Sequence, residues 1–202
     1  MRSPRSSIRH YWVALRSMLV FTLILGLVYP AVLTVVGQLA APAQANGSLI
    51  RQGDRVVGSS LIGQSFTDGS GAPLPEWFQT RPSAAGDGYD ASASSGSNWG
   101  PENSDLIEAI ARQKQAIAAS DKVAPDRIPA DALTRSASGL DPQISPDNAR
   151  MQVNRVAEAR HLPAARVERL VESKIAARDL GFLGEPTVNV LELNLALAGL
   201  KG

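Results

Sequence analysis

The sequence holds few residues that could carry out chemistry. Histidine occurs only at positions 10 and 161, and a serine hydrolase would need His161 to meet both a serine and a carboxylate. No G-x-S-x-G motif supports that arrangement. Cysteine is absent, as are H-E-x-x-H and calcium-loop motifs, so thiol nucleophiles, iron–sulfur clusters and zinc–thiolate sites are excluded. We expect no catalytic set and no bound metal or cofactor, and keep an anchored hydrolase that uses His161 as an alternative.

Phosphate and cation sites find equally little support in the sequence. No G-x-x-x-x-G-K-[ST] loop occurs. The stretch ASGLDPQIS ends where a helix is expected to start, and free N–H groups there could receive a phosphate. Ser145 is expected to cap that helix instead. Asp87, Tyr89 and Asp90 could in principle bind a cation, but aspartates in a glycine-rich loop more often form turns.

A segment without Val, Ile, Leu or Met runs from residue 80 to 103 and ends in SSGSNWGPEN. Its Ser, Gly, Ala and Pro content is typical of a flexible linker. Arg81, Tyr89, Asn98 and Trp99 are nevertheless residue types that make contacts. We therefore predict a glycine-shaped surface loop, ordered in an assembled complex, that presents Asn98 and Trp99 beside a helix.

A membrane-spanning helix is predicted at residues 17–38. From Ser17 the chain reads SMLVFTLILGLVYPAVLTVV, and twenty apolar residues rising 1.5 Å each cross about 30 Å of hydrocarbon. All four charged residues before Arg51 are arginines that precede this run. The positive-inside rule therefore predicts a single-pass protein of the inner membrane, with residues 1–16 in the cytoplasm and 39–202 outside.

Two features qualify the predicted span. The A-x-A sequence at 43–45 follows the apolar run, so a cleaved signal peptide remains an alternative. Pro30 follows Tyr29 inside the span, and because proline lacks an N–H donor it should kink the helix or mark close packing against another protein. Gly26 and Gly37 offer small faces that a neighbouring helix could approach, although a simple anchor explains them equally well.

The remainder of the chain carries 16 basic and 19 acidic residues. This weakly acidic balance argues against a nucleic-acid surface, which needs clustered Lys and Arg. The hydrophobic pattern predicts one α+β domain. Its expected elements are a hairpin at 49–57 that turns at residues 52–54, a helix at 105–119 capped by Ser104, a helix from Ser145 to about Arg160, a helix from Leu162 through Ile175, and a strand at 187–190 leading into a short helix. The two middle helices should be antiparallel neighbours, and the late strand could pair with the hairpin.

Six separated runs carry a family resemblance. They are QANGSLI at 44–50, GSSLIGQSF at 58–66, RPSA at 81–84, SSGSNWGPEN at 94–103, SASGLDPQISPDNA at 136–149 and VNVLELNLAL at 188–197. Their order and spacing, together with the N-terminal span, resemble the C chain of the bacterial potassium-transporting ATPase, the Kdp system (KdpC family). The resemblance covers essentially the whole sequence.

The resemblance implies a non-catalytic subunit of a high-affinity, ATP-driven potassium uptake complex. The implied partners are a channel-like potassium-translocating subunit, a P-type ATPase subunit and a small membrane peptide. ATP hydrolysis would belong to the ATPase subunit. The family is also described as a catalytic chaperone that raises the ATP affinity of that subunit, which conflicts with a body outside the cytoplasm, so we expect an assembling and stabilising role first.

The resemblance also selects residues for an interface or a structural motif. Those in the span are Tyr29 and Pro30. Those in the body are Arg81, Pro82, Ser83, Gly96, Asn98, Trp99, Gly100, Asp141, Asn189 and Asn194.

Overall fold

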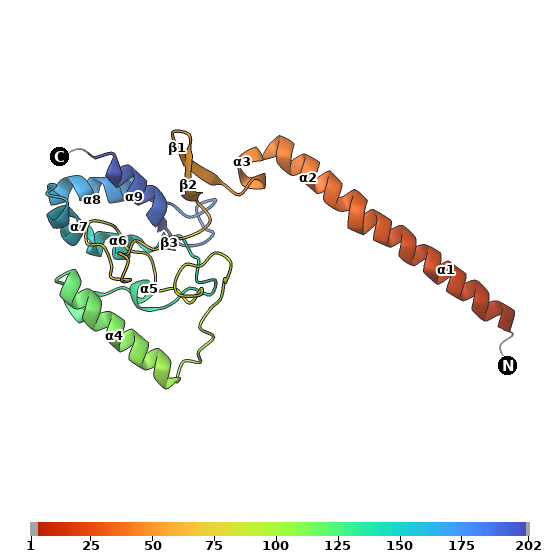
Figure 1. Ribbon diagram of the computed structural model, residues 1–202, viewed down its shortest axis with the longest axis horizontal. Coiled ribbons are helices and arrows are strands. Elements are labelled where there is room, and N and C mark those ends of the chain that lie inside the picture. Colours follow the sequence, from red (N-terminus) through yellow and green to blue (C-terminus); the bar gives the residue numbers. More distant parts are fainter. Residues whose placement is uncertain (1–3, 201–202) are drawn as a thin grey trace. The chain divides into compact units, whose positions relative to one another are not determined.

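The computed structural model describes residues 4–200 and divides into two compact units, Met1–Leu49 and Ile50–Gly202 (Figure 1). The first unit is helical. It comprises α1 (Pro4–Leu23), a π-helical turn η1 (Ile24–Val28), α2 (Tyr29–Ala40) and the short α3 (Pro42–Ala45). Residues Ile8–Ala40 are long and apolar enough to cross a membrane.

The helix passes through Pro30 without ending. The π-helical turn lies directly before Tyr29, whose N–H donates to the carbonyl of Ile24, five residues back. A wider turn moves backbone carbonyls away from the proline ring, which has no N–H to donate to them. Downstream, the Thr34 hydroxyl donates to the Pro30 carbonyl at 2.8 Å. Pro30 is thus accommodated by a local change of helix type.

The second unit mixes helices with two small sheets, so the predicted α+β class is confirmed. The predicted hairpin consists of β1 (Leu49–Gln52) and β2 (Arg55–Ser59). The remaining elements are α4 (Ser104–Ser120), η2 (Pro125–Arg127), α5 (Ala130–Leu133), β3 (Gln143–Ile144), α6 (Pro146–Met151), α7 (Val153–Ala159), α8 (Ala164–Ser173), β4 (Ile175–Ala176), β5 (Thr187–Asn189) and α9 (Val190–Ala198).

The late strand does not pair with the hairpin, so that expectation was wrong. β5 is the centre of a three-stranded antiparallel sheet, β3-β5-β4. In it Val188 pairs with Ile144 on one side and Ile175 on the other. Val188 is fully buried, whereas the residues of β1 are mostly exposed. Apolar partners for Val188 therefore come from β3 and β4 rather than from the hairpin.

Three helix boundaries differ from the prediction. Asn103, not Ser104, caps α4, because its side chain accepts hydrogen bonds from the N–H groups of Asp105 and Leu106. The helix starting at Ser145 and Pro146 is confirmed but breaks between α6 and α7 at Gln152, which turns into the core. α8 ends at Ser173, and Ile175 belongs to β4. α7 and α8 pack against each other, as expected for short-linked helices.

Phe78 and Gln79 pass through the core in a segment that is not part of a strand. The Asn194 carboxamide receives the Phe78 N–H at 3.0 Å and donates to the Phe78 carbonyl at 2.9 Å. The Gln152 carboxamide makes the same pair of bonds to Gln79, at 2.7 and 3.1 Å. Both carboxamides are buried and replace the ladder that a sheet would provide. Phe78 is thereby held in the core, in one cluster with buried residues of α6, α7, α8 and α9.

Candidate partner-contact site

The segment after residue 80 folds against the loop before β3 through Ser83. The Ser83 hydroxyl donates to the Gly139 carbonyl at 2.6 Å. The same oxygen accepts from the N–H groups of Ala85 and Tyr89, at 3.1 and 3.0 Å. The Tyr89 hydroxyl then closes the turn by donating to the Arg81 carbonyl at 2.6 Å. One serine and one tyrosine therefore order a segment that has no aliphatic core residue larger than alanine.

Glycines allow the two loops to approach each other closely. Gly139 has a φ of 67°, and a β-carbon there would lie 2.6 Å from the Ser95 carbonyl oxygen and 2.7 Å from the Ala85 nitrogen. A β-carbon at Gly96 would lie 2.8 Å from the Ala137 carbonyl oxygen. Real β-carbons do not make such contacts, so both positions require glycine. The glycine-rich loop therefore packs closely against the 134–142 loop, and its order in an assembled complex stays a prediction.

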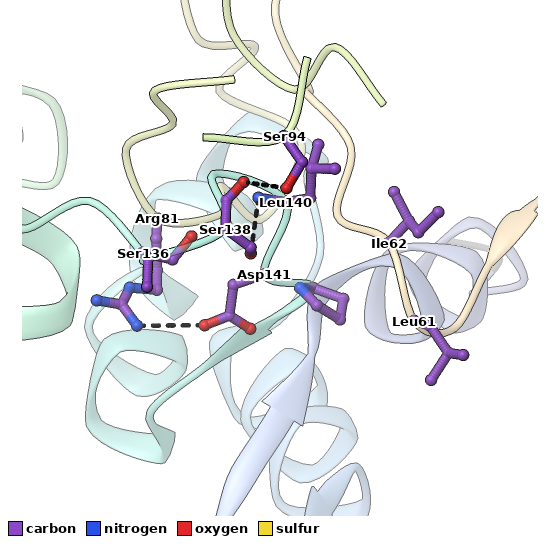
Figure 2. A pocket seen from close by; sticks show the side chains of 10 residues that line it. Leu61, Ile62, Arg81, Ser94, Ser136, Ser138, Leu140 and Asp141 are labelled. Atoms are coloured by element: carbon purple, nitrogen blue, oxygen red, sulfur yellow. Dashed lines mark hydrogen bonds and ion pairs between the residues drawn. The ribbon is translucent and has the colours of Figure 1, made fainter. Parts of the chain in front are cut away.

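A hollow of about 610 Å³ lies where these loops meet the chain after β2 (Figure 2). Arg81 and Asp141 occupy one side of it, and the apolar side chains of Leu61 and Ile62 lie on the other. Leu61 is 62% exposed. Ser94, Ser136, Ser138, Leu140, Ala137 and Pro142 complete the lining. The hollow therefore combines a charged pair with an exposed apolar rim.

The charged pair in the hollow is held loosely. Arg81 Nη1 lies 3.2 Å from Asp141 Oδ2. Its Nη2 makes only long contacts of 3.4 and 3.5 Å with Thr134 and a 3.5 Å contact with the Arg135 carbonyl. Within residues 4–200, Arg81 Nε is buried without a hydrogen-bond partner. Because this nitrogen is buried, it cannot reach a group outside the chain, and its missing hydrogen bond is a further sign that the guanidinium is held loosely.

Trp99 lies beside Arg135, whose guanidinium carbon is 4.8 Å from the ring centroid. This is a cation–π geometry, and it holds the indole half-buried next to the 134–142 loop. Asn98 adopts a left-handed φ of 53° and stays exposed. Gly100 accepts the Asn103 N–H at 3.1 Å just before α4 begins. The loop therefore presents Asn98 and Trp99 directly before a capped helix.

The sequence is similar over nearly its whole length to members of one protein family. The model of the family described as K+-transporting ATPase, c chain (KdpC) matches residues 11–199. A protein of Kineococcus radiotolerans named potassium-transporting ATPase KdpC subunit is 56% identical over 180 residues, 89% of this chain and 88% of its own length. Its namesake in Beijerinckia indica is 51% identical over 94% of this chain and 93% of its own length. The one in Mycobacterium tuberculosis is 52% identical over 91% and 95%. The chain belongs to the KdpC family.

The residues selected by the KdpC resemblance fall into three groups. Those brought together at the 134–142 loop are Arg81, Ser83, Gly96, Trp99 and Asp141, with Pro82 half-buried in the same segment and Asn98 and Gly100 following. Asn189 caps α9 and donates to the Ser60 carbonyl at 2.8 Å, and Asn194 lies in the core. Tyr29 and Pro30 lie in the span, in the other unit.

The residues considered for a cation site, a phosphate site and a hydrolase are Asp90, Ser145 and His161, and the structure shows the contacts and exposure of each. Asp90 accepts from both the N–H and the hydroxyl of Ser92, an Asx turn whose hydrogen bonds lower the pKa of the carboxyl. Ser145 caps α6, and the Asp131 carboxylate accepts from its N–H and hydroxyl. That carboxylate opposes a phosphate at this helix start. His161 is exposed at the turn between α7 and α8, where it has a left-handed φ of 54°.

The apolar rim of the hollow was not predicted as a site. Leu61 and Ile62 lie in the run GSSLIGQSF but were not selected as site residues, and their exposure depends on where the chain turns after β2. Ser136 was also missed, although it lines the hollow and is itself buried. A weak signal existed for the apolar pair, because two large apolar residues between Ser60 and Gly63 lie in a turn-rich stretch.

Tyr89 should make the stability of this KdpC body fall at alkaline pH. Burial raises the pKa of its phenol to about 12 from a usual 10. Between these values the unfolded chain loses the phenolic proton and the folded chain keeps it, so stability decreases by roughly 2–3 kcal/mol from pH 10 to 12. Tyr89→Phe should cost about 1 kcal/mol near pH 8, because the Arg81 carbonyl loses its donor. Denaturant unfolding of the full chain measures the difference in stability between Tyr89→Phe and the unaltered chain. This difference should shrink above pH 10 and then change sign, because only the unaltered chain loses stability there. Parallel pH profiles for the two chains would contradict the role given to Tyr89.

Proposed function

We propose that this chain is a non-catalytic subunit that assembles and stabilises a potassium-transporting ATPase. In this proposal the span packs within the membrane part of the complex, and the body contacts the potassium-translocating subunit through the hollow defined above. The observation that carries it is the hollow itself, in which an exposed apolar rim lies beside the partly exposed Arg81–Asp141 ion pair. Exposed apolar patches mark interaction sites, and arginine and tryptophan are enriched among the residues that dominate interfaces.

The proposed topology places residues 1–16 in the cytoplasm, 17–38 in the membrane and 39–202 outside. It rests on the arginines at positions 2, 5, 9 and 16, all of which precede residues 17–38 in the sequence. This topology separates the body from cytosolic ATP and so favours assembly over a nucleotide-dependent chaperone role. A reporter fused after Gly202 that is active only in the cytoplasm should remain silent, and activity would overturn the topology.

Leu61→Asp should reduce assembly without unfolding the body. The side chain is exposed, so a charge there costs little in the free chain, but it would lie unpaired in an apolar contact with a partner. An unpaired charge buried in such a contact costs about 2 kcal/mol or more, which corresponds to roughly 30-fold weaker association. The measurement is the yield of the other subunits that copurify with a tagged full-length chain.

Ile107→Asp is the matched control, because Ile107 on α4 is also exposed, over 57% of its surface. Circular dichroism and thermal unfolding should be unchanged in both variants. Equal copurification of the other subunits with the two variants, at the level of the unaltered chain, would refute the hollow as the contact site.

A further inference from the structure

The connection between β4 and β5 ends in a compact apolar tip, residues 179–183. Leu180, Phe182 and Leu183 are exposed over 82%, 69% and 49% of their surface. Asp179 and Leu183 form an antiparallel bridge, and Leu180 and Gly181 have φ values of 52° and 82°. A leucine in the left-handed region is strained. The turn therefore holds large apolar side chains outward against both backbone strain and the cost of their exposure.

The backbone of the tip is hydrogen bonded within itself. The Asp179 N–H donates to the Leu183 carbonyl at 3.0 Å, and the Leu183 N–H returns to the Asp179 carbonyl at 2.9 Å. The Gly181 N–H donates to the Arg178 carbonyl and the Phe182 N–H to the Asp179 carbonyl, at 3.0 and 3.2 Å. Backbone donors must be satisfied in this way before a segment can enter an apolar phase.

Charged residues flank the tip at its base rather than at its end. Arg178 and Glu185 form an ion pair across the two arms of the connection. Asp179 adjoins them in the chain. The two arms continue into β4 and β5, which are paired in the core sheet through Val188. The tip is therefore a preformed apolar turn with charged residues at its base, and the paired strands β4 and β5 hold that base in place.

We infer that this tip inserts into the interfacial region of the bilayer that holds the span. The inference requires that the N-terminal span stays attached to the body and is not cleaved as a signal peptide. Nine residues separate α2 from Ile50, so the body begins within about 35 Å of the end of the helix. Three side chains on a narrow turn offer far less than the roughly 800 Å² that each partner contributes to a stable protein interface. Exposed phenylalanine and leucine at the end of the turn, with charged residues at its base, form the kind of amphipathic surface that binds to lipid interfaces.

Single-cysteine labelling of the full-length chain tests the inference, because the sequence contains no cysteine. Phe182→Cys carries a bimane fluorophore at the tip, and Ile107→Cys carries it at an exposed control position on α4. Each labelled chain is placed in phosphatidylcholine nanodiscs with and without doxyl-labelled lipid, alone and assembled with the other subunits. We expect a blue shift at position 182 and a loss of emission with doxyl lipid, whereas position 107 is quenched only by aqueous iodide.

The outcomes separate lipid from the other occupants. Doxyl quenching at 182 in both preparations supports insertion. Equal iodide quenching at 182 and 107 overturns it in favour of a solvent-exposed turn. Protection of position 182 from both quenchers in the assembled complex overturns it in favour of a protein partner. Both positions are exposed in the folded body, so neither substitution threatens folding.

Discussion

Replacing Arg155 with methionine should lower the free energy of unfolding of the body by roughly 3–5 kcal/mol. The Arg155 guanidinium on α7 forms a salt bridge with Asp121 at the end of α4, and both side chains are almost fully buried. It also donates to the carbonyls of Pro75 and Trp77, at 2.6 and 3.0 Å. Methionine fills a similar volume but leaves the carboxylate and both carbonyls without this donor. A loss of this size is a large share of the stability of an ordinary domain.

Arg112→Met on α4 is the matched control. Arg112 pairs with Glu108 at 3.2 Å, but both side chains are largely exposed, so this change should cost less than about 0.5 kcal/mol. Urea unfolding of the full-length chain in detergent, followed by tryptophan fluorescence, compares the two. Adding Asp121→Asn to Arg155→Met should recover part of the loss, because the uncompensated charge is then gone. Equal midpoints for the two methionine variants would contradict the role given to Arg155.

Local chemistry allowed much of the fold to be predicted. The apolar run of the span, the Gly53-containing hairpin turn and the Ser145-Pro146 helix start each depend on residues that are adjacent in sequence. The structure contains all three. The strands β3 and β4 could not be predicted in the same way, because each has two residues and exists only through pairing with β5. Gln152 shows the same limit, since its helix break serves a contact 73 residues away.

The candidate site was predictable only in part for a related reason. Arg81, Ser83, Gly96 and Asp141 were selected by the family resemblance, and no local pattern indicates that they meet around Gly139. The apolar rim of the hollow needed the fold itself, because exposure is a property of the packed chain. The family resemblance therefore selected the polar residues of the site, and only the tertiary structure revealed the apolar ones.

Gly139→Ala should destabilise the body by roughly 2–4 kcal/mol, the sum of a left-handed backbone penalty and an overpacking cost. The new β-carbon would lie within 2.9 Å of Ser95 and Ala85, and two of the atoms it meets belong to backbone that cannot rotate away. Relief requires the two loops to separate, which weakens the 2.6 Å bond between Ser83 and the Gly139 carbonyl. The hollow should then widen and bind its partner less well.

Gly100→Ala separates this effect from a general cost of replacing glycine. Gly100 belongs to the same contact segment, yet a β-carbon there would meet nothing within 4 Å and its φ is not left-handed. The free energy of unfolding of Gly100→Ala should lie within about 0.5 kcal/mol of that of the unaltered chain. If the hollow is the contact site, copurification of the other subunits at a temperature where both variants are folded should fall only for Gly139→Ala. Loss of stability without loss of assembly would confine Gly139 to folding and move the partner contact to another face of the body.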